Sequence, residues 1–384
     1  MPDVRRPLRI GIDARLPSVR SGGISEYTVE LVAALAAIET DDEFLVFHAA
    51  DDPEVRVPRG AARVTRADLR TPCHHPYERV MLAAELAPHR LDVFHSPDFI
   101  PPSSGTARRV ITVHDLAFLA HPEWMNADGR RHYGAQIAIA AAQADAIACV
   151  SRHTRDDLLR RFPVSPAKVV TTPLAASARY RATPDAAQLS ATLARHDLSP
   201  GYVLFVGTLE PRKNVETLLR AHASLAHGDS EDVPLVLVGE PGWLVDGLRA
   251  VVERAGRRVR RLGRVPSDDL VRLYQGAGVL AMPSITEGFG LPVIEAMQAG
   301  CPVVCSTGGA LPETAGSAAV LVEPLDVEGW TSALRGVLLD PSLAQSLQAR
   351  GRERAAQFSW AATALATLAL YRQAASGAAP APGA

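Results

Sequence analysis

The sequence predicts an α/β protein with two domains, each built as a doubly wound parallel sheet. Three observations lead to this prediction: a length of 384 residues, short apolar runs that alternate with helical patterns, and a restart of that alternation near residue 200. Chains longer than about 250 to 300 residues usually divide into separate cores. Short apolar strands that alternate with helices are typical of parallel sheets covered on both faces.

The first half begins with a strand and a glycine-containing loop. Apolar runs predict strands at residues 8–12, 44–47, 93–95, 110–113 and 146–150. A helix is expected after Gly22-Gly23, because apolar residues then recur at spacings of three and four. These residues are Ile24, Tyr27, Leu31, Leu35 and Ile38. Ser151 follows a strand and is expected to cap the next helix.

The second half repeats this organisation. Its predicted strands cover residues 202–206, 235–238, 260–262, 279–282, 303–306 and 320–322. Asn214 is expected to cap the helix after the first of these strands. Further helices are predicted at residues 330–339, 343–358 and 360–373. Ligands of doubly wound domains bind at the carboxyl ends of the strands.

The domain boundary is expected in residues 174–199, a stretch rich in Ala, Thr and Pro. We place the first domain at residues 1–185 and the second at residues 186–358. A separate helix is assigned to residues 359–374. Residues 375–384 are small residues and proline with no core-forming pattern, so they predict a disordered tail.

Composition excludes several classes of function. Forty Lys and Arg residues balance 42 Asp and Glu residues, for a formal net charge of -2, so no overall basic field indicates nucleic acid. Cys149 and Cys305 lie in apolar runs, which is typical of core thiols in a reducing compartment. No apolar run suits a signal peptide or a membrane span. We therefore expect a cytoplasmic protein, with association at the inner face of the membrane left open.

The most informative segment, E-G-F-G-L-P-V-I-E, runs from Glu287 to Glu295 after an apolar strand. Pro292 suits the first turn of a helix. Glu287 then lies in the loop, Glu295 lies about one turn into the helix, and the intervening N–H groups favour a phosphate. Two acids beside a phosphate are suited to accept hydrogen bonds from sugar hydroxyls, which indicates a nucleotide-sugar. The alternative is an ordinary turn with a first-turn acid that offsets the helix dipole.

Three other positions carry candidate binding groups. Arg212 and Lys213 stand between a strand end and a helix start, where a diphosphate would meet two cations and helix N–H groups. Gly22-Gly23 lies in the corresponding loop of the first domain, where small residues let the backbone approach a ligand. His114 ends an apolar strand, in position to donate a hydrogen bond to a sugar. The alternatives are solvated charges, a tight turn, and a structural histidine with Asp115 as a helix cap.

Other kinds of site have less support. The Gly22-Gly23 loop lacks the G-x-G-x-x-G fingerprint, which disfavours a nicotinamide enzyme. His74-His75 has no acidic partner at metal-ligand spacing, so we reject a metal site there. Gly308-Gly309 and Glu313 form another strand–helix junction, which we assign to the wall of the cleft.

Together these segments resemble the retaining GT-B glycosyltransferases of family 4 over nearly the whole chain. The E-x7-E segment within P-S-x-x-E-G-F-G-L-P is the specific signal. V-G-T-L-E-P-R-K-N at residues 206–214 and A-G-C-P-V-V at residues 299–304 also match. Gly22-Gly23 and Val113-His114-Asp115 add weaker similarity. Thr208 stands where many members have Arg, and Gly278 stands where Asp is common.

The resemblance implies two Rossmann-like domains that face each other across a cleft, with the donor bound mainly by the second domain and the acceptor by the first. The last helix would return to the first domain. Lys213 and Arg212 would hold the diphosphate, Glu287 would reach the donor sugar and Glu295 the ribose, while His114 would lie by the transferred sugar. The remaining donor contacts would come from Gly22, Gly23, Gly288, Phe289, Gly290 and Leu291. Members of the family retain anomeric configuration and need no cofactor or obligatory metal.

We therefore predict a glycosyltransferase with His114, Glu287, Arg212 and Lys213 as catalytic residues. The H-D-L-A-F and G-T-L-E-P-R-K-N segments resemble mannosyltransferases, so GDP-mannose is the lead donor and UDP- or dTDP-sugars come next. A glycan, a lipid-linked molecule or a natural product is the expected acceptor. The alternatives are a nucleotide-sugar epimerase or hydrolase, and a nucleotide-sugar-binding protein without activity.

Overall fold

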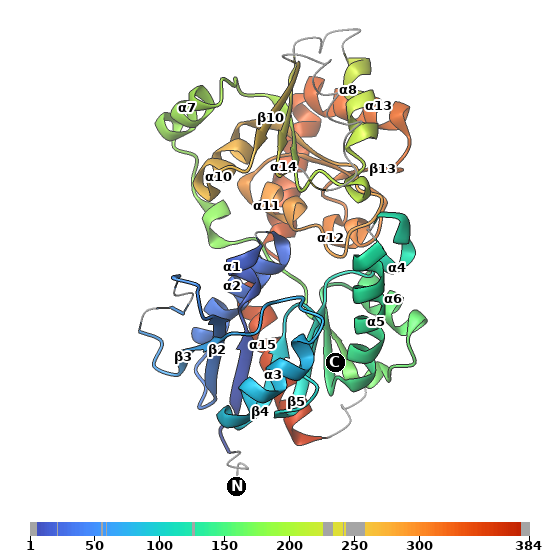
Figure 1. Ribbon diagram of the computed structural model, residues 1–384. Coiled ribbons are helices and arrows are strands. Elements are labelled where there is room, and N and C mark those ends of the chain that lie inside the picture. The colour runs from blue at the N-terminus through green and yellow to red at the C-terminus, as the bar shows by residue number, and fades with distance from the viewer. Residues whose placement is uncertain are drawn as a thin grey trace. The chain divides into compact units, whose positions relative to one another are not determined.

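The computed structural model describes residues 6–20, 22–54, 57–58, 60–124, 127–225, 233–240, 242 and 258–377. The chain forms two compact units (Figure 1). Unit 1 comprises Met1–Leu174 and Ser359–Ala384, and unit 2 comprises Ala175–Phe358. Each unit contains one parallel sheet with helices, as the alternation of strands and helices predicted.

Unit 1 holds a seven-stranded sheet in the order β3-β2-β1-β4-β5-β6-β7. Its strands are β1 (Arg9–Asp13), β2 (Glu43–Ala49), β3 (Val64–Leu69), β4 (Leu91–Ser96), β5 (Thr106–Val113), β6 (Ala146–Cys149) and β7 (Val169–Thr171). The apolar runs predicted all of them except β3 and β7, which are the two edges of the sheet. An edge strand has one neighbour, and only the first and last residues of β3 are buried, so no apolar run marks it.

Unit 2 holds a six-stranded sheet in the order β10-β9-β8-β11-β12-β13. Its strands are β8 (Tyr202–Val206), β9 (Leu235–Val238), β10 (Val259–Gly263), β11 (Ala277–Met282), β12 (Val303–Ser306) and β13 (Val320–Val322). All six were predicted, four of them with their observed bounds. Strands β8, β9, β11 and β12 are buried over most of their length, so their apolar runs are continuous.

Helices link these strands. In unit 1 they are α1 (Leu16–Val19), α2 (Gly23–Ala36), α3 (Glu78–Leu86), α4 (Ala117–Ala120), α5 (Ala127–Gln143), α6 (Arg152–Arg161) and α15 (Trp360–Ser376). In unit 2 they include α7 (Ala186–Arg195), α8 (Val215–Leu225), α10 (Ser267–Gly276), α11 (Leu291–Ala299), α12 (Leu311–Ala315), α13 (Val327–Leu339) and α14 (Pro341–Ala355). Within the described ranges, no helix combines the length and apolar character needed to span a bilayer.

The strand order of each sheet reverses at one point, between β1 and β4 in unit 1 and between β8 and β11 in unit 2. The loops that leave two such strands run to opposite sides of the sheet and open a crevice at the carboxyl edge. In unit 1 this places the loop before α2 beside the end of β4. In unit 2 it places the short turn η5 (Pro211–Lys213) beside the loop that precedes α11.

The boundary between the units lies at Leu174 and Ala175, at the start of the stretch 174–199 in which it was expected and eleven residues before the assigned bound of residue 185. The reason is the turn η4 (Ala178–Arg181), which packs against α10 and α11. Its Tyr180 is buried with the ring edge-to-face against Tyr274, 5.6 Å between centroids. Burial of this aromatic ring therefore joins the segment to unit 2.

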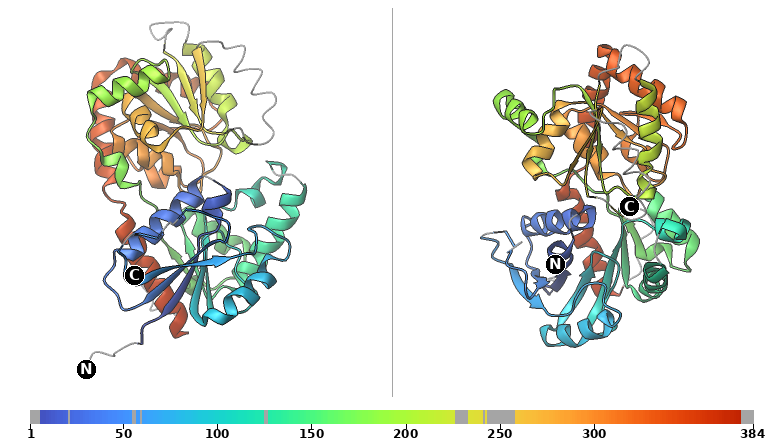
Figure 2. Two further views of the ribbon diagram at one scale, coloured as in Figure 1. Left: turned by 60° about the vertical axis from the view of Figure 1, so that its left-hand side comes forward. Right: turned by 45° about the horizontal axis from the view of Figure 1, so that its top comes forward.

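Helix α15 belongs to unit 1, where it contacts α2, β4, β5 and β6 (Figure 2). Its Tyr371 hydroxyl lies 2.7 Å from Nδ1 of His95, and the ring of Trp360 lies 6.1 Å from that of Tyr27. The helix continues to Ser376, two residues beyond the expected bound. Residues 378–384 of the expected tail lie outside the described residues.

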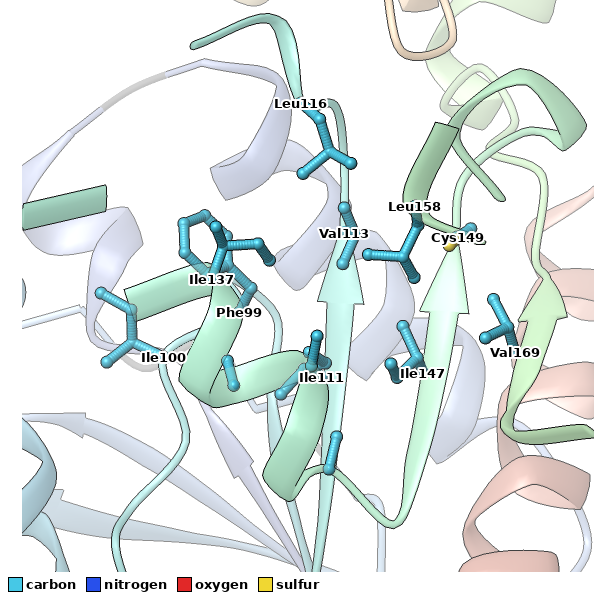
Figure 3. Packing of buried hydrophobic residues seen from close by; sticks show 13 residues of the cluster. Phe99, Ile100, Ile111, Val113, Leu116, Ile137, Ile147, Cys149, Leu158 and Val169 are labelled. Carbon is cyan, nitrogen blue, oxygen red and sulfur yellow. The ribbon is translucent and has the colours of Figure 1, made fainter. Parts of the chain in front are cut away.

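A cluster of buried apolar residues holds β5, β6 and β7 against α5 and α6 (Figure 3). Ile111 and Val113 of β5 pack there with Cys149, whose thiol is free and buried as expected. Full burial of one such aliphatic side chain is worth about 1.5 to 3 kcal/mol. The cluster thereby anchors the end of β5, from which His114 continues.

Candidate active site

The carboxyl edge of the unit 2 sheet brings Arg212, Lys213 and Glu287 into one cluster. Glu287 follows β11, and the two cations form the turn after β8, the neighbouring strand. Nζ of Lys213 lies 2.6 Å from Oε1 of Glu287, and Nη1 of Arg212 lies 2.7 Å from Oε2. Residues that lie 74 and 75 positions apart in the chain therefore form one ionic cluster.

Glu287 is only 6% exposed and remains charged. Burial by itself would raise its pKa, because a low-dielectric environment disfavours the carboxylate. The charges of Arg212 and Lys213 and the hydrogen bonds from Lys213 and Ser284 outweigh burial and lower the pKa to about 2. Glu287 is thus a hydrogen-bond acceptor at neutral pH.

The two cations have different positions in the cluster. Arg212 donates from Nε and Nη2 to Glu210 and from Nη1 to the Thr286 carbonyl as well as to Glu287. Its guanidinium is thereby held in one orientation. Lys213 donates one of the three N–H groups of its ammonium to Glu287. Lys213 therefore has donors left for an anion, whereas Arg212 mainly positions Glu287.

Asn214 connects the two loops instead of capping α8 as expected. Its φ of 53° places it in the left-handed region, and its amide donates to the carbonyls of Pro283 and Pro324, at 3.0 and 2.7 Å. Its side-chain oxygen accepts from the Thr217 hydroxyl, not from a helix N–H group. Asn is favoured both at helix starts and in left-handed backbone, so the residue type alone does not distinguish the two roles. The structure shows that Asn214 has the second role.

Gly308 and Gly309 pack directly against the loop that carries Glu287. A side chain at Gly309 would lie 2.4 Å from the Glu287 carbonyl oxygen, and one at Gly308 would lie 2.3 Å from that of Ile285. Gly309 also has a φ of 63°, which favours glycine. These two glycines, which we predicted in the wall of a cleft, allow the Glu287 loop to pass close to them.

Helix α11 begins as the E-x7-E segment predicted. Gly290 precedes it with a φ of 91°, and Pro292 lies in its first turn. Glu287, Gly288 and Phe289 lie in the loop, and Leu291 is the first helical residue. The first N–H groups of a helix have no partner within it, so this end favours an anion.

Glu295 lies in the fifth position of α11 and is buried. Its Oε2 accepts a hydrogen bond of 2.9 Å from the hydroxyl of Tyr274 in α10. Burial and the neighbouring carboxylate raise the pKa of Tyr274 far above its usual range, so the phenol keeps its proton and donates. Tyr274 was not predicted as a site residue, because no sequence signal links it to Glu295.

The remaining predicted site residues belong to unit 1. Gly22 and Gly23 are exposed at the start of α2, and Gly22 has a φ of 141°. Nε2 of His114 lies 3.0 Å from the Pro97 carbonyl, and its ring packs edge-to-face against that of Tyr27. Burial lowers the pKa of His114, so the imidazole is neutral and Nε2 carries the donated hydrogen.

Comparison with known proteins agrees with the prediction of a glycosyltransferase. Two family models match, glycosyl transferases group 1 over residues 194–354 and glycosyltransferase family 4 over residues 21–176. The O-antigen chain mannosyltransferase B of Escherichia coli is 34% identical over 366 residues, which cover 91% of this chain and 96% of that protein. This chain belongs to glycosyltransferase family 4. The prediction of a glycosyltransferase is confirmed.

Two further proteins are similar to this glycosyltransferase. A D-inositol 3-phosphate glycosyltransferase of Corynebacterium diphtheriae is 30% identical over 307 residues, which cover 74% of this chain and 71% of that protein. The solved structure of sucrose-phosphate synthase from Thermosynechococcus elongatus matches with a TM-score of 0.76 and 24% identity, over 95% of this chain and 98% of that one. The latter likeness shows the GT-B fold.

Among the residues that the structure describes, no three His, Cys, Asp or Glu side chains are placed to hold a metal ion together. His74 and His75, which the sequence analysis did not assign to a metal site, lie among these described residues. His74 does have an acidic partner, Asp98, with 2.7 Å between Nε2 and Oδ2. That partner lies 24 positions away, beyond the reach of a spacing rule.

Proposed function

We propose that this enzyme transfers a sugar from a nucleotide-diphosphate sugar, with GDP-mannose as the lead donor, to a hydroxyl of a glycan, lipid-linked or small-molecule acceptor. We further propose that the product keeps the anomeric configuration of the donor. The observation that carries this proposal is the contact of Lys213 and Arg212 with Glu287 at the unit 2 sheet edge. It joins a cation suited to phosphate with a carboxylate suited to sugar hydroxyls.

The diphosphate would bind at Lys213 and at the start of α11. Two N–H groups of the Lys213 ammonium remain for phosphate oxygens after the bond to Glu287. The backbone of residues 288–291 would add donors and the positive end of the helix dipole. Arg212 would keep Glu287 in place while the donor sugar hydroxyls donate to it.

The chemistry would depend on charge that develops on the leaving group. As the bond between the sugar and the diphosphate breaks, negative charge grows on the phosphate oxygen and positive, oxocarbenium-like character grows on the sugar. Lys213 and the helix N–H groups would stabilise the phosphate charge. The acceptor oxygen would attack from the same face, and its proton would pass to the departing phosphate.

Metal-independent transfer is part of this proposal, because Lys213 and α11 supply positive charge where the diphosphate would bind. Neither Glu287 nor Glu295 is proposed as a nucleophile, since hydrogen bonds hold both carboxylates in binding positions. His114 would donate from its ring to the transferred sugar after exchange of its bond to Pro97.

The donor assignment rests on similarity. The Escherichia coli relative that covers nearly the whole chain is a mannosyltransferase by name. The inositol phosphate glycosyltransferase is less similar and covers less of the chain. We also propose a cytoplasmic location, because all four cysteines are free, as expected in a reducing compartment.

The test begins with thermal unfolding of the full chain in a panel of GDP-, UDP- and dTDP-sugars, since a ligand that binds the folded state raises its stability. GDP-mannose is expected to give the largest shift. Transfer to methyl glycosides is then followed by NMR, with and without EDTA. An α-linked product that forms with EDTA present supports the proposal. Inverted products, EDTA-sensitive turnover, or release of free sugar alone would contradict it.

A further inference from the structure

The loop between Glu287 and α11 is bonded to the segment that leads into α12. The Glu287 carbonyl accepts a hydrogen bond of 2.8 Å from the N–H of Ala310, and the Phe289 carbonyl accepts one of 2.5 Å from the hydroxyl of Thr314 in α12. Helix α12 also packs against α11 (Figure 1). Two carbonyls of the loop are therefore fixed by residues 308–314, a segment that the proposed donor site leaves without a role.

These bonds determine the direction of two N–H groups. In a planar trans peptide, the carbonyl oxygen and the following N–H point to opposite sides. The described residues contain no cis peptide bond. The Phe289 carbonyl points to Thr314, so the N–H of Gly290 points away from that residue. The N–H of Gly288 likewise points away from Ala310. Both N–H groups are among those that we propose as donors to the diphosphate.

The peptide between Phe289 and Gly290 depends on the Thr314 bond for its orientation. Glycine adopts many backbone conformations, so Gly290 by itself does not fix the direction of its N–H group. A buried carbonyl without a hydrogen-bond partner costs free energy, so the loop keeps the orientation in which Thr314 donates. Thr314 is fully buried in the fourth position of α12. Its hydroxyl therefore sets the direction of the Gly290 N–H.

Arg354 of α14 holds α12 in place. Its Nε lies 2.9 Å from the Thr314 carbonyl, and its Nη2 lies 2.6 Å from the Glu313 carbonyl. Carbonyls at the end of a helix lack partners within the helix, so a cation stabilises this end. The guanidinium also lies over the ring of Phe358, 4.7 Å from its centroid, and that ring meets Phe289 edge-to-face at 5.5 Å. Arg354 thus connects α12 and the loop to α14.

We propose that Thr314 is a positioning residue for the donor diphosphate: its hydroxyl holds the Phe289 carbonyl so that the N–H of Gly290 donates to a phosphate oxygen. Thr314 itself does not contact the donor. Arg354 supports this arrangement by fixing the end of α12. The inference rests on the proposed function and adds to it a side chain that acts on the donor through the loop.

The test compares the dissociation constant of GDP for the full chain and its variants by isothermal titration calorimetry. UDP and dTDP are titrated in parallel, and the comparison uses whichever nucleotide binds the wild type most tightly. Thr314→Val keeps the shape and removes the hydroxyl. It is expected to raise the dissociation constant roughly tenfold, about the worth of one hydrogen bond to a charged group. Thr314→Ser, which keeps the hydroxyl, is expected to restore binding.

Thr331→Val is the matched control. Thr331 is also a buried residue of unit 2, and its hydroxyl donates to the carbonyls of Val327 and Ala221, at 2.8 and 3.2 Å. Both valine variants are expected to lower the free energy of unfolding in urea, because each removes a buried hydrogen bond. Only Thr314→Val is expected to weaken nucleotide binding, and this difference separates positioning from a general contribution to stability.

Arg354→Met tests the same arrangement with the Thr314 hydroxyl intact, and it decides the question if Thr314→Val does not fold. It is expected to raise the dissociation constant roughly two- to threefold, at the low end of the worth of one hydrogen bond. Arg350→Met is its control, because Arg350 lies on the same helix and donates to a different backbone carbonyl, that of Ser317, at 2.7 Å. This control is expected to bind the nucleotide as the wild type does.

The outcomes distinguish this inference from the proposed function. Equal affinity of wild type and Thr314→Val, or an equal loss of affinity in Thr314→Val and Thr331→Val, would overturn the inference alone. Failure of Thr314→Ser to restore binding, or equal affinity of Arg354→Met and Arg350→Met, would also overturn it. If the wild type binds none of GDP, UDP and dTDP, the proposed function fails and this inference fails with it.

Discussion

The carboxyl edges of the two sheets have the same topology and different charge balance. In unit 2, Arg212 and Lys213 face Glu210 and Glu287, so two cations match two carboxylates beside the start of α11. In unit 1, Arg15 alone faces Asp13 and Glu78, and Asp98 adds a further carboxylate. The two edges therefore differ in how their carboxylates are paired with cations.

The fold determines where a site lies, whereas the side chains at that position determine which ligand can bind. In unit 2, the start of α11 and the N–H groups of Lys213 that remain after its bond to Glu287 are suited to the proposed phosphate. Four experiments test the roles of the charged groups at the two sheet edges.

Arg15→Met removes the cation between two carboxylates of unit 1 and is expected to cause the largest effect, a loss in the free energy of unfolding. It leaves Asp13 and Glu78 buried without their cation, and loss of one partner from a buried ion pair costs about 3 to 5 kcal/mol. Urea unfolding followed by circular dichroism measures this loss. Arg63→Met is the control, because its pair with Asp41 is exposed and worth less than about 1 kcal/mol. Equal losses in the two variants would refute the proposed importance of burial.

Lys213→Met would remove from unit 2 the side chain that we propose binds the phosphate. Removal of one donor to a developing anion typically lowers kcat about 100- to 1,000-fold. Glu287 keeps Arg212 and Ser284 as partners, so the variant is expected to fold. The chain has one other lysine, Lys168, and Lys168→Met serves as the control. Turnover with GDP-mannose within tenfold of wild type would remove Lys213 from the mechanism.

The pH dependence of stability sharpens the role of Glu287. Its pKa in the folded protein is about 2, below the ordinary 4.5, so folding favours the charged form. The resulting stability is complete above about pH 4.5 and is lost as the pH falls toward 2, with a total of about 3 kcal/mol. Comparison of urea unfolding for wild type and Glu287→Gln should show a difference that shrinks through this window. A constant difference from pH 6 to pH 3 would contradict this assignment.

Tyr274→Phe tests the smallest effect, the support of Glu295 by one hydrogen bond. The donor KM is expected to rise roughly three- to tenfold with little change in kcat. Tyr202→Phe is the control, because its buried hydroxyl donates to the Leu273 carbonyl away from Glu295. An equal change of donor KM in both variants would assign the effect to general loss of packing.

Local sequence determined the secondary structure well where a strand is a run of three or more consecutive apolar residues. Strands β8, β9, β12 and β13 have their predicted bounds, although β13 is an edge strand. The edge strands β3 (V-T-R-A-D-L) and β7 (V-V-T) contain no such run and were missed. Ser151 caps α6 as expected, with Thr154 N–H donating to its Oγ at 3.0 Å. Such features depend on neighbours within a few residues, so periodicity and caps reveal them.

The E-x7-E segment by itself determined that a turn, a helix start and two acids follow a buried strand. That Glu287 meets Lys213 and that Tyr274 holds Glu295 came from the tertiary structure alone. These contacts join residues far apart in the chain, which the fold brings together. The order of the strands in the fold is set by which apolar faces pack together over the whole domain, and no local pattern of residues contains it.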